Sequence, residues 1–314
     1  MARKLKFDLT VDANALLCPN PNEFYSKAYI TEDIVNNYRT LPGIKYKTKI
    51  ANVLFANDLL QASGCAWSAT DSTLDAIDID VCPISAMAQI CRFDIEQSFV
   101  SAWMAKGSSA PFDVNAFMAY YWETMSMKIG EGIEQIRWRG NSAGSTGTAI
   151  DLCDGYEIKL CADAAVVQIV SATVTASNVI VEMNKLFSAL LPAVQGKIKD
   201  LRFYVSSNVA AAFLQATYNY TNANIPSVDG GFQMTWLGIK IVTAQGMSNN
   251  TMVLTLKDNM VYAFDGDNDA KVLKSVNLED TVAEPILRTR ADLKTGFFYT
   301  NPEEIVFYSA GPCS

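Results

Sequence analysis

Residues 236–265 of this 314-residue chain read WLGIKIVTAQGMSNNTMVLTLKDNMVYAFD. Three runs in this stretch, 238–242, 251–255 and 260–264, are rich in β-branched, aromatic and other apolar residues. Such residues favour the pleated, half-buried surface of a β-strand. The stretch therefore predicts three strands. Two further runs, 297–299 and 305–308, predict strands near the end of the sequence.

Upstream of this stretch, strand-like and helix-like segments alternate. Residues 201–205 (LRFYV) predict a short strand that leads into a helix at 209–218. Apolar residues recur every three or four positions over 180–191, which predicts an amphipathic helix with Ser177 as its N-cap. Residues 156–160 (YEIKL) alternate apolar and polar side chains and predict a strand. The mixture indicates the α+β class.

The longest helical pattern covers residues 112–138, where apolar residues recur at three- and four-residue spacing. At ~1.5 Å per residue such a helix is roughly 40 Å long, which is typical of a spine and not of a small bundle. Gly130 and Gly132 interrupt it, although each interior glycine costs about 1 kcal/mol relative to alanine. Two explanations remain open: close packing against a crossing strand, or a hinge.

Residues 44–88 predict a long hairpin with an exposed tip, because the period of the sequence changes to two on both of its arms. The first arm carries a row of lysines and the second a row of aspartates. These rows either pair with each other across the hairpin or meet a neighbouring subunit, where charge sets register and specificity. The candidate intersubunit contacts are Lys45, Lys47, Lys49, Trp67, Asp78 and Asp80.

Composition excludes several classes of protein. A net charge of −8 argues against a nucleic-acid-binding module, which needs a clustered basic surface. No apolar run is long enough to span a membrane, and none follows the basic N-terminal residues as in a signal peptide. We therefore expect a cytoplasmic protein. Its seven cysteines are irregularly spaced, and we interpret them as reduced, small apolar residues.

The chain contains no histidine, so catalytic triads that use histidine and histidine-based metal sites are excluded. The sequence Gly140-Asn141-Ser142-Ala143-Gly144 matches a nucleophile elbow. An elbow serine needs a base, usually histidine, and the chain has none, so the sequence is better explained as a flexible loop. The acidic run at 265–269 (DGDND) resembles half of a calcium loop, without the glycine and glutamate that complete one. We expect no catalytic residue, cofactor or metal.

Several segments in this order resemble the major capsid proteins of tailed double-stranded DNA phages, which have the Hong Kong 97-type (HK-97-like) fold. The segments are DLRFYVSSNV at 200–209, WLGIKIVT at 236–243, GMSNNTMVLT at 246–255, DNMVYAFD at 258–265, KTGF at 294–297 and EEIVFY at 303–308. The resemblance implies an N-terminal arm at 1–42 and an extended hairpin loop at 43–90. It further implies a peripheral domain at 91–172 and 276–314, with the spine helix at 112–138, and an axial domain at 173–275.

The function that this resemblance implies is self-assembly and not catalysis. Hexamers and pentamers of the chain would build an icosahedral head in the host bacterial cytoplasm and enclose double-stranded DNA without reading its sequence. Portal, scaffolding and decoration proteins are the expected partners, and the virion is the expected location. The alternatives are an encapsulin-like nanocompartment shell, an intracellular enzyme with a serine or aspartate nucleophile, and a tail or fibre module.

Overall fold

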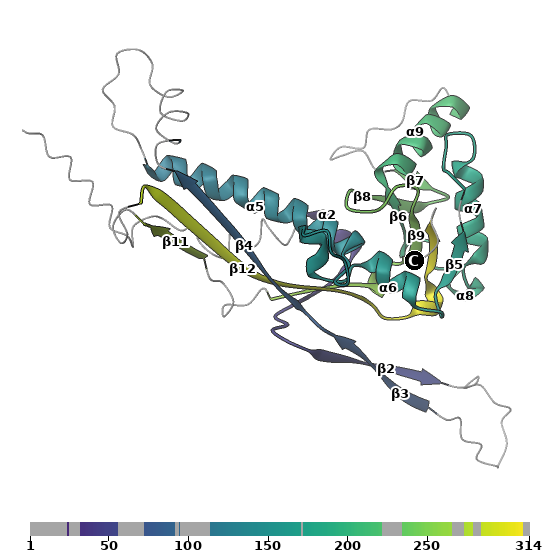
Figure 1. The fold of residues 1–314 in the computed structure, drawn as a ribbon. Helices are drawn as coiled ribbons and strands as arrows, with labels where there is room; N and C mark the ends of the chain where they lie inside the picture. Colours follow the sequence, from purple (N-terminus) through teal and green to yellow (C-terminus); the bar gives the residue numbers. More distant parts are fainter. Residues whose placement is uncertain are drawn as a thin grey trace, which may run out of the picture. The chain divides into compact units, whose positions relative to one another are not determined.

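The computed structural model describes residues 24, 32–55, 72–91, 94, 114–170, 172–221, 234–265, 273–278 and 284–309 (Figure 1). Trp67 lies outside these residues. The chain forms two compact units. One contains Met1–Thr31, Pro83–Gly130 and Gly266–Leu293, and the other contains Glu32–Cys82, Glu131–Asp265 and Lys294–Ser314. None of the described helices is long and apolar enough to cross a membrane.

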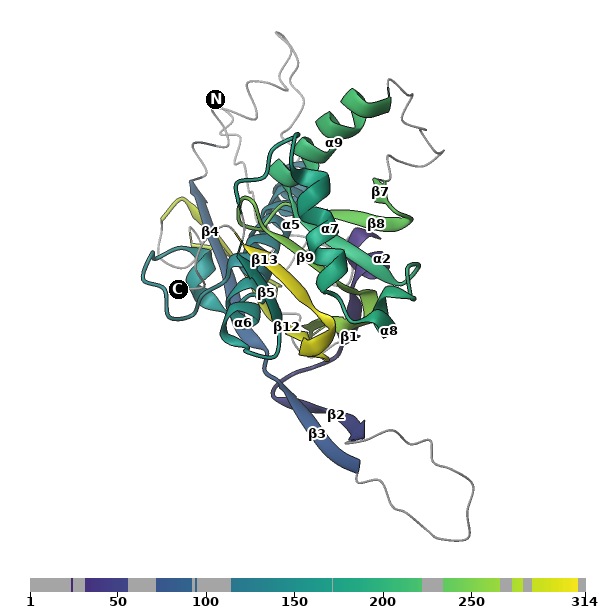
Figure 2. The same ribbon diagram turned by 90° about the vertical axis from the view of Figure 1, so that its right-hand side faces the viewer.

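The larger unit contains a six-stranded mixed sheet with the strand order β5-β13-β9-β6-β8-β7. Its strands are β5 (Val167–Val170), β6 (Leu201–Ser206), β7 (Thr235–Trp236), β8 (Ile239–Ala244), β9 (Met252–Leu256) and β13 (Val306–Ser309). Helices α7 (Val179–Ala189), α8 (Pro192–Gln195) and α9 (Ser207–Thr221) accompany this sheet, and α7 and α9 lie side by side against it (Figure 2). Leu186, Phe203, Phe213 and Leu254 are buried in the resulting core.

A second group of elements in the same unit surrounds the end of the long helix α5 (Val114–Arg139). It comprises α2 (Glu32–Asn37), β1 (Arg39–Pro42), α6 (Tyr156–Ala162), β10 (Met260–Phe264) and the last residues of β12 (Ile286–Tyr299). Strand β10 pairs with β1 in parallel and with β12 in antiparallel orientation. Short 3-10 helices connect elements of this unit at Ala149–Leu152, Lys257–Asn259 and Pro302–Glu304.

Buried aromatic rings and one buried cation form the centre of this second group. The rings belong to Tyr38, Trp138, Tyr156, Tyr204, Tyr262 and Phe297. The guanidinium of Arg137 lies 5.2 Å from the centre of the Tyr38 ring and 4.9 Å from that of Tyr262. Its Nη1 is 2.5 Å from Oε2 of Glu134, one helical turn earlier. Burial opposes the charge of Arg137, but Glu134 and the surrounding phenols outweigh burial and raise its pKa.

The smaller unit packs the first part of α5 against one face of a sheet. The strands that this unit contributes to the sheet are β4 (Cys82–Cys91), β11 (Leu273–Asn277) and the first part of β12. Along β12, Leu287, Thr289 and Ala291 are buried, whereas Arg288 and Arg290 between them are exposed. The Tyr121 hydroxyl of the helix lies 3.0 Å from Oγ1 of the buried Thr289. The buried residues on alternate positions of β12 therefore face the helix.

The remaining strands, β2 (Thr48–Phe55) and β3 (Ser72–Ile79), form an antiparallel two-stranded sheet. Among the described residues these strands pair only with each other. They extend away from the other sheets of their unit (Figures 1 and 2). This confirms the predicted hairpin at its two arms, but its predicted extent of 44–88 is too long: residues from Cys82 onward form β4, which pairs with β12 in another sheet.

Most of the elements predicted from hydrophobic periodicity are present, but two details differ. The segment 156–160 is the start of helix α6 and not a strand. Tyr156 and Leu160, four residues apart, are both fully buried, and in so short a segment this spacing also fits a two-residue alternation. Helix α7 begins at Val179, with Asn178 in place of Ser177 at the N-cap position.

Candidate assembly site at the root of the hairpin

The charged rows of the hairpin contact each other. Nζ of Lys47 lies 2.8 Å from Oδ2 of Asp78, and Nζ of Lys49 lies 3.5 Å from Oδ1 of the same carboxylate. The hydrogen bond from Lys47 lowers the pKa of Asp78, and the same bond raises the pKa of Lys47. All three side chains are exposed. Asp78 is thus shared between two lysines, as the explanation by internal pairing requires.

The other two candidates on the hairpin are Lys45 and Asp80, and the charge of Asp80 adds to the rise in the pKa of Lys47. The backbone oxygen of Lys45 accepts a hydrogen bond of 3.1 Å from Nζ of Lys294. The same ammonium lies 4.4 Å from the centre of the Tyr46 ring and 3.8 Å from the buried carboxylate of Asp265. Lys294 therefore fixes the start of the first arm. Asp80 is exposed and follows directly after the end of β3.

A small apolar cluster anchors the hairpin at its root. Ile79 and Val81 are buried together with Ala263, and Phe298 packs against them. Gly296 belongs to this contact, because a Cβ there would lie 2.8 Å from the backbone oxygen of Asp80. Only glycine lets the two backbones approach so closely. Noncovalent contacts with β10 and β12 thus anchor the root, while Lys47, Lys49 and Asp78 on the hairpin are exposed.

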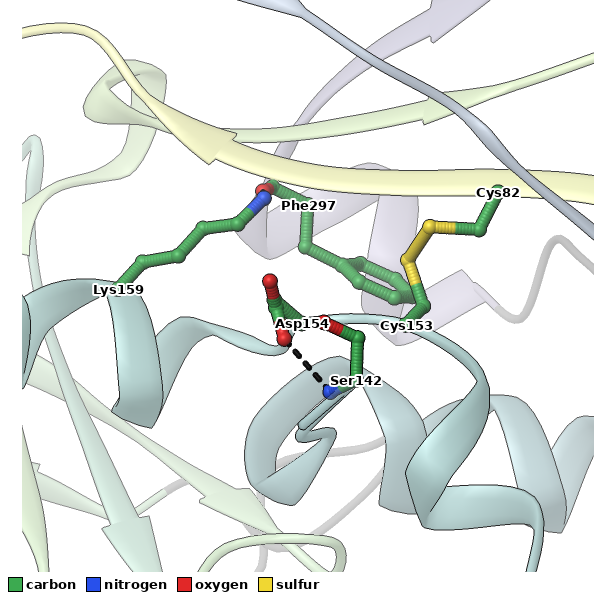
Figure 3. Close-up of a disulfide and its surroundings, with 6 residues drawn as sticks. All are labelled: Cys82, Ser142, Cys153, Asp154, Lys159 and Phe297. Carbon is green, nitrogen blue, oxygen red and sulfur yellow. Dashed lines mark hydrogen bonds between the residues drawn. A yellow bond between two sulfur atoms is a disulfide. The ribbon is translucent and has the colours of Figure 1, made fainter. Parts of the chain in front are cut away.

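One residue beyond this cluster, Cys82 forms a disulfide with Cys153 (Figure 3). Their Cα atoms are 5.9 Å apart, within the usual range for a disulfide. Cys161 is disulfide-bonded as well, and Cys91 is free. The expectation that all cysteines are reduced is therefore wrong. Irregular spacing concealed the pairing, because Cys82 and Cys153 are 71 residues apart and only the fold brings them together.

Lys159 lies beside this root, on α6. Its Nζ donates a hydrogen bond of 2.6 Å to the backbone oxygen of Phe297 and lies 3.9 Å from the centre of the Phe298 ring. Burial lowers the pKa of Lys159 to about 8, although Asp154 and Asp80 oppose this shift. A pocket of about 660 Å³ opens here, lined by Asp78 of the hairpin and by Lys159. Asp78, one of the candidate intersubunit contacts, thus borders this pocket.

The two motifs that suggested chemistry contribute to the structure in other ways. In the elbow-like sequence, the backbone N–H of Ser142 donates to Oδ1 of Asp154 at 2.7 Å, and the backbone N–H of Gly147 donates to Asp151 at 2.7 Å. The two aspartates thus hold the loop in shape. The acidic run 265–269 is described only at Asp265. In the described part of the chain, no three Asp, Glu, Cys or His side chains are placed to hold a metal ion.

The two glycines of the spine helix occupy a special position. The boundary between the two compact units falls between Gly130 and Glu131, within α5. A Cβ added at Gly132 would meet no atom within 4 Å outside the adjacent helix backbone. Close packing therefore does not explain Gly132, and the hinge remains as a proposal.

Neither a protein-family profile nor a curated protein sequence matches the chain. Solved structures do. A chain of the satellite phage P4 procapsid with size determination (Sid) protein superposes with a TM-score of 0.58 at 11% identity, over 92% of this chain and 97% of the other. This chain has an HK-97-like capsid fold. A capsid chain of a native GTA particle has a TM-score of 0.56 at 12% identity, with 93% and 91% of the two chains covered. A chain from Gordonia phage Cozz also has a TM-score of 0.56, at 10% identity, with 98% of this chain and 96% of the other covered.

Within this HK-97-like fold, the glycine pair gives a testable prediction. Replacing Gly130 and Gly132 with alanine is expected to stabilise α5 by up to ~2 kcal/mol, because each glycine costs about 1 kcal/mol in a helix interior. We also expect assembled particles to become narrower in size distribution or fewer in number, since a stiffer helix adopts fewer curvatures. Electron microscopy of the particles and urea unfolding measure the two effects. If the particles of the double variant had the size, yield and stability of wild type, the hinge would be excluded. The control is Gln135→Ala, which changes an exposed residue of α5.

Lys159 gives a prediction about pH. Its pKa is about 8 in the folded chain and 10.5 ordinarily, so the unfolded chain binds more protons between these values and folding stability rises with pH there. Lys159→Met removes the cost of the buried charge. Below pH 8, the free energy of unfolding of the variant is expected to exceed that of wild type by up to about 3 kcal/mol. The loss of the hydrogen bond to Phe297 reduces this gain. The difference between variant and wild type should shrink towards pH 10.5. Urea unfolding across this range measures it, with Lys197→Met at an exposed site as control. If the free energies of unfolding of variant and wild type differed by the same amount at all pH values, the lowered pKa of Lys159 would be contradicted.

Proposed function

We propose that this chain is the major capsid protein of a tailed double-stranded DNA phage. Its copies self-assemble as hexamers and pentamers into an icosahedral head. The observation that carries the proposal is the match to phage and GTA capsid chains over nine-tenths or more of both chains. The protein acts by assembly and has no catalytic role.

The parts of the chain divide this work among them. We propose that residues 1–42 act as an arm and 43–90 as the extended hairpin loop. Residues 91–172 and 276–314 form the peripheral domain, and 173–275 the axial domain. The hairpin reaches a neighbouring subunit, and two observations support this role: it pairs with no other described strand, and Lys47, Lys49 and Asp78 on it are exposed. A noncovalently anchored root with exposed charged side chains suits an element that binds outside its own subunit.

Double-stranded DNA is held inside the head by the wall and not by affinity. The net charge of −8 supports this, because a wall that repels phosphates leaves the DNA free to be packed and released. Portal, scaffolding and decoration proteins are the partners at the vertices and on the two surfaces of the shell. Assembly takes place in the bacterial cytoplasm, and the finished protein is located in the virion.

Electron microscopy of the protein purified from a bacterial expression host tests this function. We expect hollow shells or capsomers that sediment far faster than a 34.4 kDa monomer. Particles from a phage lysate should contain nuclease-resistant double-stranded DNA. Particles filled with an enzyme instead would establish the encapsulin-like alternative. A protein that remains monomeric at every concentration, with or without a crowding agent, would contradict assembly altogether.

A further inference from the structure

We propose that the Cys82–Cys153 disulfide is a modification added after assembly, with Cys82 as the first cysteine to react. It then links the root of the hairpin to the end of the spine helix. This inference rests on the proposed function, because it needs a particle that assembles inside a cell and later leaves it. It assigns separate roles to two cysteines whose environments differ.

The position of the bond makes it a link between two parts of the larger unit. Cys82 lies one residue after the buried Val81, at the point where the chain leaves the hairpin. Cys153 precedes Gly155, where a Cβ would lie 2.6 Å from the backbone oxygens of both Ile136 and Trp138. The segment that carries Cys153 is therefore pressed against the last turn of α5. The bond connects the hairpin to this rigid end of the helix (Figure 3).

Before this bond forms, the root has weaker constraints. The apolar cluster of Ile79 and Val81 and the contacts of Lys294 are noncovalent. Such contacts allow the hairpin to adjust its angle while subunits meet. The disulfide removes this freedom, since it restrains two segments that are 71 residues apart in the sequence. If the disulfide forms after assembly, it therefore preserves the hairpin angle that contact with the neighbouring subunit selected.

The compartment determines when the bond can form. Thioredoxin and glutathione keep thiols reduced in the bacterial cytoplasm, so the pair is expected to be open there. Outside the cell, the oxidant is a small-molecule disulfide such as oxidised glutathione. The thiolate of one cysteine attacks a sulfur of this disulfide and releases one glutathione thiol. The thiolate of the other cysteine then attacks the mixed disulfide and releases the second. Two cysteine thiols are oxidised, one small disulfide is reduced, and the two protons go to the released thiols.

Exposure determines the order of these steps. Cys153 is 2% exposed, whereas Cys82 is partly exposed at the start of β4. Of the two residues, Cys82 is therefore the more accessible to a molecule of the size of oxidised glutathione. Cys153 is buried directly beside it and resolves the mixed disulfide without any need for solvent access. Cys82 is therefore the attacking residue and Cys153 the resolving residue.

The test uses assembled particles from a bacterial expression host, lysed with an alkylating agent and then denatured in its presence, so that buried free thiols are trapped as well. Peptide mass mapping should find Cys82 and Cys153 alkylated in these particles. Particles prepared without alkylation and then treated with oxidised glutathione should have both protected. In Cys153→Ser particles, the treatment should leave a glutathione adduct on Cys82. In Cys82→Ser particles, no adduct should form at Cys153. Cys91→Ser, at the free cysteine, should behave as wild type.

A second readout measures the consequence of the bond. Oxidation should raise the melting temperature of wild-type and Cys91→Ser particles by at least about 5 °C, and that of the Cys82→Ser and Cys153→Ser particles much less. A disulfide already complete in the trapped particles would overturn the proposed timing. An adduct on Cys153 in place of Cys82 would overturn the order. If no particles form in either redox state, the proposed function itself fails, and this result is distinguishable from the other two.

Discussion

Replacing Lys45, Lys47 and Lys49 together with glutamate is expected to give a folded protein that no longer forms shells. The folded state should survive, because Lys47 and Lys49 are exposed and surface ion pairs contribute little to stability. Assembly should fail, because each hairpin would present reversed charges to its neighbour, and like charges at an interface are strongly unfavourable. We expect the yield of shells to fall at least about tenfold. Sedimentation and circular dichroism measure the two properties.

A charge exchange separates the two explanations of the lysine row. The double variant Lys47→Asp, Asp78→Lys keeps an ion pair within the hairpin but inverts the charges that a neighbour meets. If the row matters only within the hairpin, this variant assembles like wild type. If the row meets a neighbouring subunit, the variant fails to assemble although it is folded. Unfolding of the triple glutamate variant would instead indicate an internal role.

The largest loss of stability is expected at Arg137. Arg137→Ala should lower the free energy of unfolding by about 3–5 kcal/mol, because it leaves Glu134 without its partner and opens a space between the Tyr38 and Tyr262 rings. Urea unfolding of variant and wild type in the same assembly state measures this loss. Gln135→Ala, an exposed neighbour on the same helix, should change stability by less than about 0.5 kcal/mol.

The companion variant Glu134→Leu, Arg137→Leu tests whether the loss comes from the unpaired charge. Removing both ionic groups often has little effect or stabilises a protein, since the cost of burying the charges disappears with them. We therefore expect the double variant to be clearly more stable than Arg137→Ala. A double variant as unstable as the single one would show that packing between the rings, and not the charge, is decisive.

The elements with long or regular patterns were predictable from the sequence. The spine helix, predicted at 112–138, covers 114–139, because many apolar residues repeat over seven turns. The strands β8, β9 and β10 were also predicted at their places, and the two arms of the hairpin were predicted within a few residues of β2 and β3. Opposite charges at Lys47 and Asp78 were visible in the sequence as well. The register of the hairpin, which decides their contact, appears only in the structure.

Features that depend on distant residues were not predictable. Arg137 occurs in the last turn of α5, where an arginine usually lies in solvent and interacts with the helix dipole. Its burial depends on Tyr38 and Tyr262, which come from elsewhere in the chain. The Cys82–Cys153 bond was missed for the same reason, and no spacing signal identifies it. The coincidence of the glycine pair with the boundary between units also appears only in the fold.

Cryo-electron microscopy of the assembled particles tests the central claim most directly. The account predicts a closed shell built from this chain in fivefold and sixfold clusters, with the β2–β3 hairpin of each subunit lying against a neighbouring subunit. A map in which the hairpin is folded back on its own chain with both faces buried, or a protein that builds no closed particle, would contradict it.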